Sequence, residues 1–455
     1  MASVKKEKTT NSSSASNDDF AIALEDNNQE SSKMEDLREK LKRKKKEEKV
    51  GSSNSMSIEM EVSIRLGVIG VGQAGSRIAQ EFGKLGYHSY AINTSKQDLE
   101  YIDIPENKKL LLEGSLGGTG KDLDLGRDIF DQNTEILNNF VEEVVSGNDM
   151  LYLAVSGGGG TGSSSVDTMV NIMYSTGAPV GVIYVLPKDT DDAQAKKNSL
   201  ETLSRLAKMS SDNILSNLIV VDNAKIEQIY ADLSQAEFWD TANNAIVEPL
   251  HIFNNLTATA SRHTSLDPSD FAKIISCGDC SIYGVIEVED YMEETAMAEA
   301  VIESLNQSML AEGFDVSQAR VGGVIITGTK KVMDKIPASN INYCFHMVSE
   351  QTEGASLFQG VYDVHTKSDS VKIYTWLAGL GLPRKRIDTL QEESRRLEEV
   401  NLNKLSNRSS QMALDLGGDD TSSASKEIRR KIQKKKSGFG RLQKGRSSII
   451  DRRRR

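Results

Sequence analysis

Short apolar segments alternate with longer amphipathic stretches over residues 61–236. The apolar segments cover residues 63–69, 89–92, 151–155, 180–186 and 218–221. One of the stretches between them carries Leu200, Leu203 and Leu206 at helical spacing. Strands that are apolar on both faces are typical of a parallel sheet covered by helices, so the pattern predicts an α/β domain here.

The second half of the chain repeats this alternation after a long helical stretch. Residues 237–264 have the pattern of one helix that links two halves, and residues 265–383 predict a second α/β domain. The expected elements of that domain are a helix over 294–311 and strands near 281–288, 322–327, 341–347 and 370–376. Residues 384–410 are rich in Arg and Glu and predict a charged C-terminal helix.

Both ends of the chain are polar and predict flexible termini. Residues 1–60 hold few apolar side chains and cannot bury a core, although residues 32–49 could form a charged helix. Residues 411–455 begin as a linker rich in Gly, Ser and Thr and end in a basic tail. The predicted fold class is therefore α/β, with a parallel-sheet domain joined by a long central helix to a second α/β domain.

The most informative motif is a glycine-rich loop that follows the apolar segment 150–155. It leads directly into an apolar helical stretch, which gives the order strand, loop, helix. Backbone N–H groups in such a loop, together with the positive end of the helix dipole, bind phosphate without a lysine. No Gly-Lys-Ser/Thr closes the loop, so it is not a Walker A motif, and a plain linker would not lie between two apolar elements. The candidate phosphate ligands are Gly158, Gly159, Gly160, Thr161, Gly162 and Ser163.

A second glycine loop, at the end of segment 63–69, has the spacing G-x-G-x-x-G. Its candidate ligands are Gly70, Gly72, Gln73, Ala74 and Gly75. This spacing is also typical of Rossmann dinucleotide sites, which place an acidic residue about 20 residues further on for the ribose. Here the next strand ends in Asn93, an amide. A Rossmann-type NAD(P)-dependent oxidoreductase is therefore disfavoured, but it remains an alternative.

The two glycine loops, with Asn93 and Thr94 between them, resemble the tubulin/FtsZ superfamily of GTP-dependent filament proteins. The run Gly-Gly-Gly-Thr-Gly-Ser that begins at Gly158 matches the signature of that superfamily, and the resemblance covers about residues 61–405. Segment 376–385 looks like the TubZ-type branch of plasmid and phage proteins. The resemblance implies binding of GTP/GDP with Mg²⁺, GTPase activity and polymerisation of the chain with itself into a filament.

The resemblance also assigns residues to the guanine end of the nucleotide. Asn223 resembles a residue that reaches the guanine or the ribose, and Trp239 and Asn243 resemble residues that stack on the base and read its edge. An amide offers both the donor and the acceptor that a guanine edge requires. Each assignment has a structural alternative, because the asparagines could cap a helix or a turn and Trp239 could be a core aromatic.

At the other end of the nucleotide, the resemblance places a γ-phosphate-sensing loop over Gly118, Thr119 and Gly120. The adjacent Lys121 and Asp122 would hold phosphate charge and magnesium-bound water, or would be a solvated loop. Hydrolysis in this superfamily uses carboxylates that a neighbouring subunit supplies. Asp270 fits that motif, but Lys273 replaces its last acid, so we assign the catalytic role jointly to Asp267 and Asp270. The alternative for Asp267 is a helix N-cap. Two further departures from the family pattern are Ser156 and Ser164, where glycine is usual.

The charge of the chain is divided sharply. From Lys426 to Arg455 the chain has a net charge of +12, which leaves −23 on residues 1–425 of a chain whose total is −11. Such a tail predicts an anionic partner. In the resembling plasmid proteins a basic tail engages a DNA-bound adaptor, so the expected partner is that adaptor or DNA itself. A tail that only keeps the protein soluble is one alternative. An FtsZ-like division protein is the other, although the tail lacks the apolar and proline residues of a membrane-adaptor motif.

Composition excludes several classes. No run approaches the ~20 apolar residues of a transmembrane helix, and the N-terminus lacks the apolar centre of a signal peptide. Cys277 and Cys280 form a C-x-x-C without a second pair, so no metal site is expected. We therefore expect a cytoplasmic protein without a membrane partner.

Overall fold

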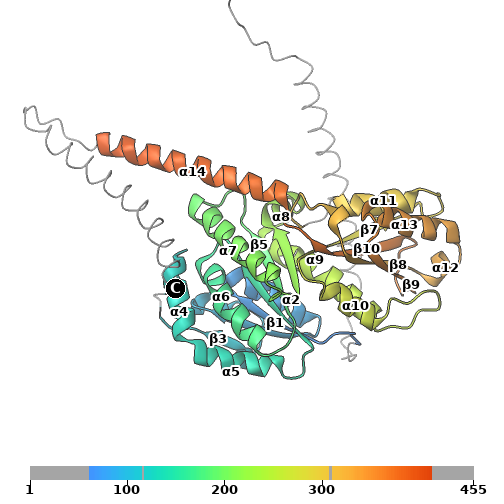
Figure 1. Ribbon diagram of the computed structural model, residues 1–455, viewed down its shortest axis with the longest axis horizontal. Coiled ribbons are helices and arrows are strands. Elements are labelled where there is room, and N and C mark those ends of the chain that lie inside the picture. Colours follow the sequence, from blue (N-terminus) through green and yellow to red (C-terminus); the bar gives the residue numbers. More distant parts are fainter. Residues whose placement is uncertain (1–60, 115–116, 307–309, 412–455) are drawn as a thin grey trace, which may run out of the picture. The chain divides into compact units, whose positions relative to one another are not determined.

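A single sheet runs through the part of the chain that the structure describes. The computed structural model describes residues 61–114, 117–306 and 310–411 (Figure 1). Its strands are β1 (Leu66–Val71), β2 (His88–Asn93), β3 (Lys109–Leu111), β4 (Met150–Ser156), β5 (Val180–Leu186), β6 (Asn217–Asp222), β7 (Cys280–Val288), β8 (Val321–Gly328), β9 (Ser356–Asp363) and β10 (Val371–Leu380). They lie in the order β3-β2-β1-β4-β5-β6-β7-β10-β8-β9.

The first six strands form the parallel half of the sheet, as the alternating pattern predicted. Every neighbouring pair from β3 to β6 is parallel. All residues of β1, β5 and β6 are buried, because helices cover both faces of this half. These helices are α2 (Gly72–Lys84), α3 (Lys96–Glu100), α4 (Leu123–Gln132), α5 (Thr134–Val145), α6 (Gly160–Ser175), α7 (Ala193–Ser211) and α8 (Asn223–Ile229). Because the strands are parallel, the loops at their carboxyl ends share one edge of the sheet.

Helix α9 (Gln235–Leu256) crosses from that edge to the opposite one. Near its end, the Asn254 side chain accepts a hydrogen bond from the backbone N–H of Ile64 and donates one to the carbonyl of Ile64, both at 2.8 Å. Ile64 lies just before β1, so the end of α9 lies where β1 begins. The sequence predicted this helix over 237–264, but it ends at Leu256.

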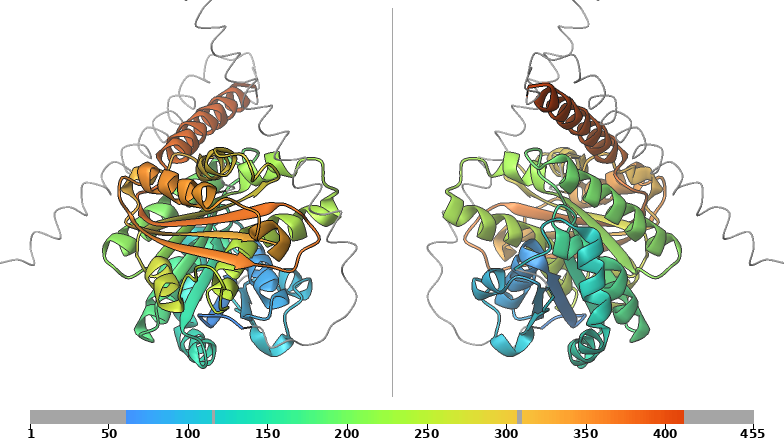
Figure 2. Two further views of the ribbon diagram at one scale, coloured as in Figure 1. Left: turned by 90° about the vertical axis from the view of Figure 1, so that its right-hand side faces the viewer. Right: turned by 90° about the vertical axis from the view of Figure 1, so that its left-hand side faces the viewer.

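The second half of the sheet is mixed. Strand β10 is antiparallel to both β7 and β8, whereas β9 is parallel to β8. This half joins the first through two residue pairs between β6 and β7, Leu218 with Cys280 and Ile219 with Ser281. Its helices are α10 (Pro268–Ile275), α11 (Ala296–Asn306), α12 (Lys330–Met333) and α13 (Ala338–Gln351). Figure 2 shows the molecule from the right-hand and the left-hand side of Figure 1, with the C-terminal half in yellow and orange.

One strand expectation was wrong. Residues 341–347 were expected to form a strand, but they lie in the helix α13. The buried residues of that helix are Asn340, Cys344, Phe345 and Val348, which share one helical face. These residues form the face of α13 that packs inward. The sequence also missed β9, and the helix expected over 294–311 is the shorter α11.

The long charged helix α14 (Arg384–Gln411) follows β10. Among the described residues, those up to Arg395 belong to one compact unit with the sheet, and those from Arg396 on belong to a second unit. The helix expected over 32–49 and the basic tail lie outside the described residues. No helix in the described part of the chain is both long enough and apolar enough to cross a bilayer.

Candidate functional site

The glycine-rich loop lies at the carboxyl edge of the parallel half, between β4 and α6. Gly159 occupies the N-cap position of α6, where no side chain caps the helix, and the first turn contains no acidic residue. A Cβ added at Gly159 would meet no atom within 4 Å. The first N–H groups of α6 are thus left without a side-chain acceptor, beside open space. This is the geometry of an anion site.

Hydroxyl groups within the loop have structural roles. The buried Ser163 hydroxyl lies 2.6 Å from the carbonyl oxygens of both Gly157 and Gly159, so it donates to the loop itself. Thr161 exchanges a 2.8 Å hydrogen bond with Thr94, which follows β2. Ser164 packs against Gly126 of α4, where an added Cβ would overlap its hydroxyl oxygen. The serine that replaces the usual glycine at position 164 therefore faces α4.

The other glycine loop, which follows β1, lies beside the glycine-rich loop after β4. Helix α2 begins at Gly72 without a side-chain cap, and a Cβ added there would lie 3.3 Å from the backbone nitrogen of Gly162. A Cβ at Gly75 would overlap the carbonyl oxygen of Ala154, so only glycine lets α2 pack this closely on β4. Of the remaining candidates in this loop, Gly70 is buried, Gln73 is exposed and Ala74 is half-buried. Two uncapped helix N-termini thus meet at one edge.

Asn93 ends β2 at the same edge and is 1% exposed. Its side-chain oxygen accepts hydrogen bonds from the N–H groups of Thr94 at 2.8 Å and Ser95 at 3.1 Å. The amide therefore shapes the turn that brings Thr94 to α6.

The loop that carries Gly118, Thr119 and Gly120 packs against the start of α6. Both glycines have positive φ, and so does Lys121, with φ of 67°. The Thr119 hydroxyl lies against Gly160, is buried, and has no hydrogen-bond partner among the described residues. An unpaired buried hydroxyl next to an uncapped helix fits a phosphate oxygen.

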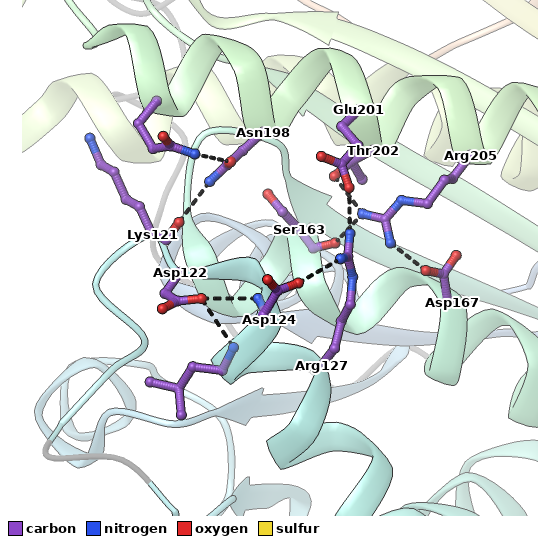
Figure 3. A network of polar contacts seen from close by, with 12 residues as sticks. Lys121, Asp122, Asp124, Arg127, Ser163, Asp167, Asn198, Glu201, Thr202 and Arg205 are labelled. Atoms are coloured by element: carbon purple, nitrogen blue, oxygen red, sulfur yellow. Dashed lines mark hydrogen bonds and ion pairs between the residues drawn. The ribbon is translucent and has the colours of Figure 1, made fainter. Parts of the chain in front are cut away.

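Lys121 and Asp122 form polar contacts with the starts of the neighbouring helices α7 and α4 (Figure 3). The Lys121 ammonium pairs with Asp192 at 2.8 Å. The backbone carbonyl of Lys121 accepts a hydrogen bond from the side chain of Asn198 on α7 at 2.9 Å. This ammonium holds the pKa of Asp192 below its ordinary value through a hydrogen bond. Asp122 caps α4 by accepting from the N–H groups of Asp124 and Leu125.

Arg205 of α7 is a residue that sequence reasoning missed. Its guanidinium donates to the carbonyl of Ser163 at 3.2 Å and to Thr202 at 3.0 Å, and it pairs with Asp167 (Figure 3). It therefore ties the first turn of α6 to α7. Nothing local in the sequence marks it, because the contact joins residues 42 positions apart.

Trp239 lies near the start of α9 and is neither fully buried nor fully exposed. The Arg77 guanidinium of α2 lies 5.0 Å from the centre of its ring, and the Lys188 ammonium from the loop after β5 lies 4.8 Å away. Asn243, one helical turn further on, is 7% exposed. Asn223 is half-buried at the first position of α8. These residues line the same carboxyl edge as the glycine loops.

Asp267 and Asp270 lie apart from all of these residues. They follow α9, whose end is fixed at the start of β1, whereas the glycine loops follow the end of β1. Asp267 occupies the N-cap position of α10 and is exposed, and its side chain makes no capping hydrogen bond. Asp270 pairs with Lys273 at 2.9 Å. The structure thus brings the phosphate and base candidates to the carboxyl edge of the parallel half and leaves the two acids in the C-terminal half, next to β9.

The chain matches two family models. Residues 65–231 match "Tubulin/FtsZ family, GTPase domain", and residues 253–391 match "Tubulin/FtsZ-like protein TubZ-like, C-terminal domain". The first match contains both glycine loops. The second contains the two acids and the first part of α14.

Known relatives agree with these matches. The tubulin-like protein CetZ of Pyrococcus abyssi is 26% identical over 69% of this chain and 85% of its own length. The tubulin-like protein TubZ of Bacillus cereus is 22% identical over 77% of this chain and 87% of its own. The GTPγS-form protofilament of TubZ from Bacillus thuringiensis serovar israelensis has the same fold, with a TM-score of 0.67, 20% identity, and coverage of 77% of this chain and 95% of that one. The chain belongs to the tubulin/FtsZ family of GTPases, with TubZ-like similarity in its C-terminal half.

Proposed function

We propose that this protein binds GTP at the carboxyl edge of its parallel half-sheet, polymerises with itself, and hydrolyses GTP between adjacent subunits. The observation that carries the proposal is the separation of the two acids from the glycine loops. Asp267 follows Leu266, whose backbone N–H donates to Tyr362 of β9, and β9 lies six strands away from β4 in the sheet. At about 4.8 Å between neighbouring strands, the acids lie roughly 25–30 Å from the glycine-rich loop of their own subunit. Head-to-tail packing would bring them to a neighbour's nucleotide, and repetition of that contact builds a filament.

The phosphates would lie across the two uncapped helix N-termini. Backbone N–H groups from Gly158 to Gly162 and at the start of α2 would donate to phosphate oxygens. The unpaired Thr119 hydroxyl would then gain its partner. Mg²⁺, when bound, offsets phosphate charge. Among the described residues no group of three or more His, Cys, Asp or Glu could hold a metal ion, so water and phosphate oxygens would be its main ligands.

The guanine would stack on Trp239. Its partly exposed ring gives a flat apolar surface, and the nearby Arg77 and Lys188 add positive charge that suits a nucleotide. Asn243 and Asn223 would read the edge of the base or the ribose, because each offers a donor and an acceptor.

For hydrolysis, Asp267 and Asp270 of the neighbouring subunit would orient the attacking water. Positioning of the nucleophile is the main task in this reaction. Asp267 is exposed and does not cap its helix, whereas Lys273 offsets the charge of Asp270. Asp267 would therefore make the larger contribution.

The proposed cargo is DNA, bound directly or through an adaptor by the basic tail. The support is the charge of +12 from Lys426 to Arg455, together with the similarity of the C-terminal half to TubZ. An FtsZ-like role in cell division is the alternative.

The test is a concentration series in which light scattering and phosphate release are recorded after GTP is added. Assembly with a shared site requires both signals to appear only above a critical concentration. Phosphate release that stays linear in protein without scattering would mean that each subunit has a complete site. Binding of NAD but not GTP would favour the oxidoreductase.

A further inference from the structure

A buried arginine from the C-terminal helix reaches the base side of the candidate site. Arg386, in the first turn of α14, is 7% exposed. Its Nε lies 2.9 Å from the Asp222 carboxylate, close enough for an ion pair although the N–H is not aligned for a hydrogen bond. Its Nη2 donates to Asp189 at 3.2 Å and to the carbonyl of Pro187 at 3.3 Å. One guanidinium thus bridges the end of β6 and the loop after β5.

Both of these segments position residues that are proposed to contact the guanine base or its ribose. Asp222 caps α8 by accepting a hydrogen bond from the N–H of Ala224 at 3.1 Å, and this capped turn carries Asn223. The loop after β5 carries Lys188, which lies over the Trp239 ring and also pairs with Glu227 of α8.

The bridge depends on the guanidinium group itself. Burial raises the pKa of Asp222, and the charge of Arg386 opposes that rise. Without Arg386, the buried Asp222 carboxylate would lose its main counter-ion and keep only the weaker effect of Lys225, so the cap that it forms would be disturbed. A lysine could not replace the bridge fully, because an ammonium is a point charge whereas the planar fork spans two acceptors.

Attachment of α14 does not depend on Arg386 alone. Glu393, two turns later, pairs at 2.7 Å with Lys196 of α7, which is 2% exposed. Ile387 and Leu390 on the same part of the helix are buried in the core. The first part of α14 therefore has its own apolar and ionic contacts with the sheet unit.

We propose that Arg386 is a positioning residue for the nucleotide, because it fixes the turn that presents Asn223 and the loop that places Lys188 beside Trp239. The C-terminal helix would thereby set the affinity for the guanosine end of the ligand. The inference rests on the proposed function, since it takes the residues of this edge to be guanosine contacts.

The test is a double-mutant cycle between Arg386→Ala and Asn223→Ala. Affinity for GDP is measured by calorimetry at low protein concentration, because GDP has the same base and ribose as GTP. Arg386→Ala should weaken GDP binding about tenfold, the loss expected when one hydrogen bond of the ligand is misplaced. In the Asn223→Ala background the same change should weaken binding clearly less than about tenfold, because one of the two contacts that Arg386 positions is already absent.

Arg384→Ala is the matched control, since it removes an exposed arginine from the same turn and should leave the affinity unchanged. Arg386→Lys should fall between wild type and Arg386→Ala, and it decides the question if the alanine variant does not fold. Unaltered affinity in the Arg386 variants, or equal losses in both backgrounds, would overturn the inference while the proposed function stands. A wild-type chain that binds neither GDP nor GTP would overturn both.

Discussion

At the scale of single residues, Gly159 is the position where fold and function can be separated most cleanly. Its φ of −83° suits any amino acid, and a Cβ there would meet no neighbour. The fold therefore does not require glycine at this position. The proposed phosphate binding would, because a side chain would project into the space beside the uncapped N-terminus of α6.

Gly159→Asp should leave the nucleotide-free protein as stable as wild type, or stabilise it by about 0.2–0.5 kcal/mol, because aspartate is a slightly better N-cap than glycine. The same carboxylate should repel phosphate, so we expect GTP binding to fall at least a hundredfold. Thermal unfolding and nucleotide titration measure the two effects. Gly159→Asn supplies the cap without the charge and should lose less affinity. Wild-type affinity in the aspartate variant would mean that phosphate lies elsewhere.

At the scale of elements, the contact between α4 and α6 holds the loop with Thr119 against the glycine-rich loop. Gly126 of α4 faces the Ser164 side chain without room for a Cβ. The serine that departs from the family pattern is thus matched by a glycine on the facing helix.

Gly126→Ala should destabilise the protein by about 1–3 kcal/mol through overpacking, although glycine to alanine within a helix ordinarily stabilises. Adding Ser164→Gly should restore most of the loss, because it removes the overlapping hydroxyl. Urea unfolding of the two single variants and the double variant measures this coupling. Additive effects would show that the two residues do not meet.

The elements also show where sequence reasoning succeeds and fails. Strands β4, β5 and β6 could be predicted because strands covered on both faces are continuously apolar, and the glycine loops could be placed because they follow such strands. Residues 341–347 misled because a short, mostly apolar stretch does not distinguish a strand from a helix. Arg205 and Arg386 were invisible, since their partners lie far away in the sequence. The sequence showed an amide at Asn93 instead of an acid, but only the folded chain shows that this amide accepts hydrogen bonds from the turn that follows it.

At the scale of the whole molecule, the basic tail is expected to act separately from the GTPase. Deletion of residues 426–455 should leave GTP turnover unchanged and abolish co-sedimentation with DNA. In the intact protein that co-sedimentation should weaken steeply as salt rises, because phosphate contacts release counter-ions. A tail of equal length with every Lys and Arg changed to Gln is the matched control and should behave like the deletion. DNA binding by the truncated chain would show that the tail is not the DNA-binding segment.

The central claim is that one active site is built from two subunits, and mixing two inactive variants tests it most directly. Asp267→Ala/Asp270→Ala should bind GTP and form long-lived polymers, whereas Gly159→Asp should bind no GTP but keep its acids. Phosphate release is measured for each protein alone and for the mixture, and sedimentation reports whether both enter the same polymer. We predict that the mixture hydrolyses GTP although neither protein does so alone. A polymer that contains both variants and releases no phosphate would contradict a shared site.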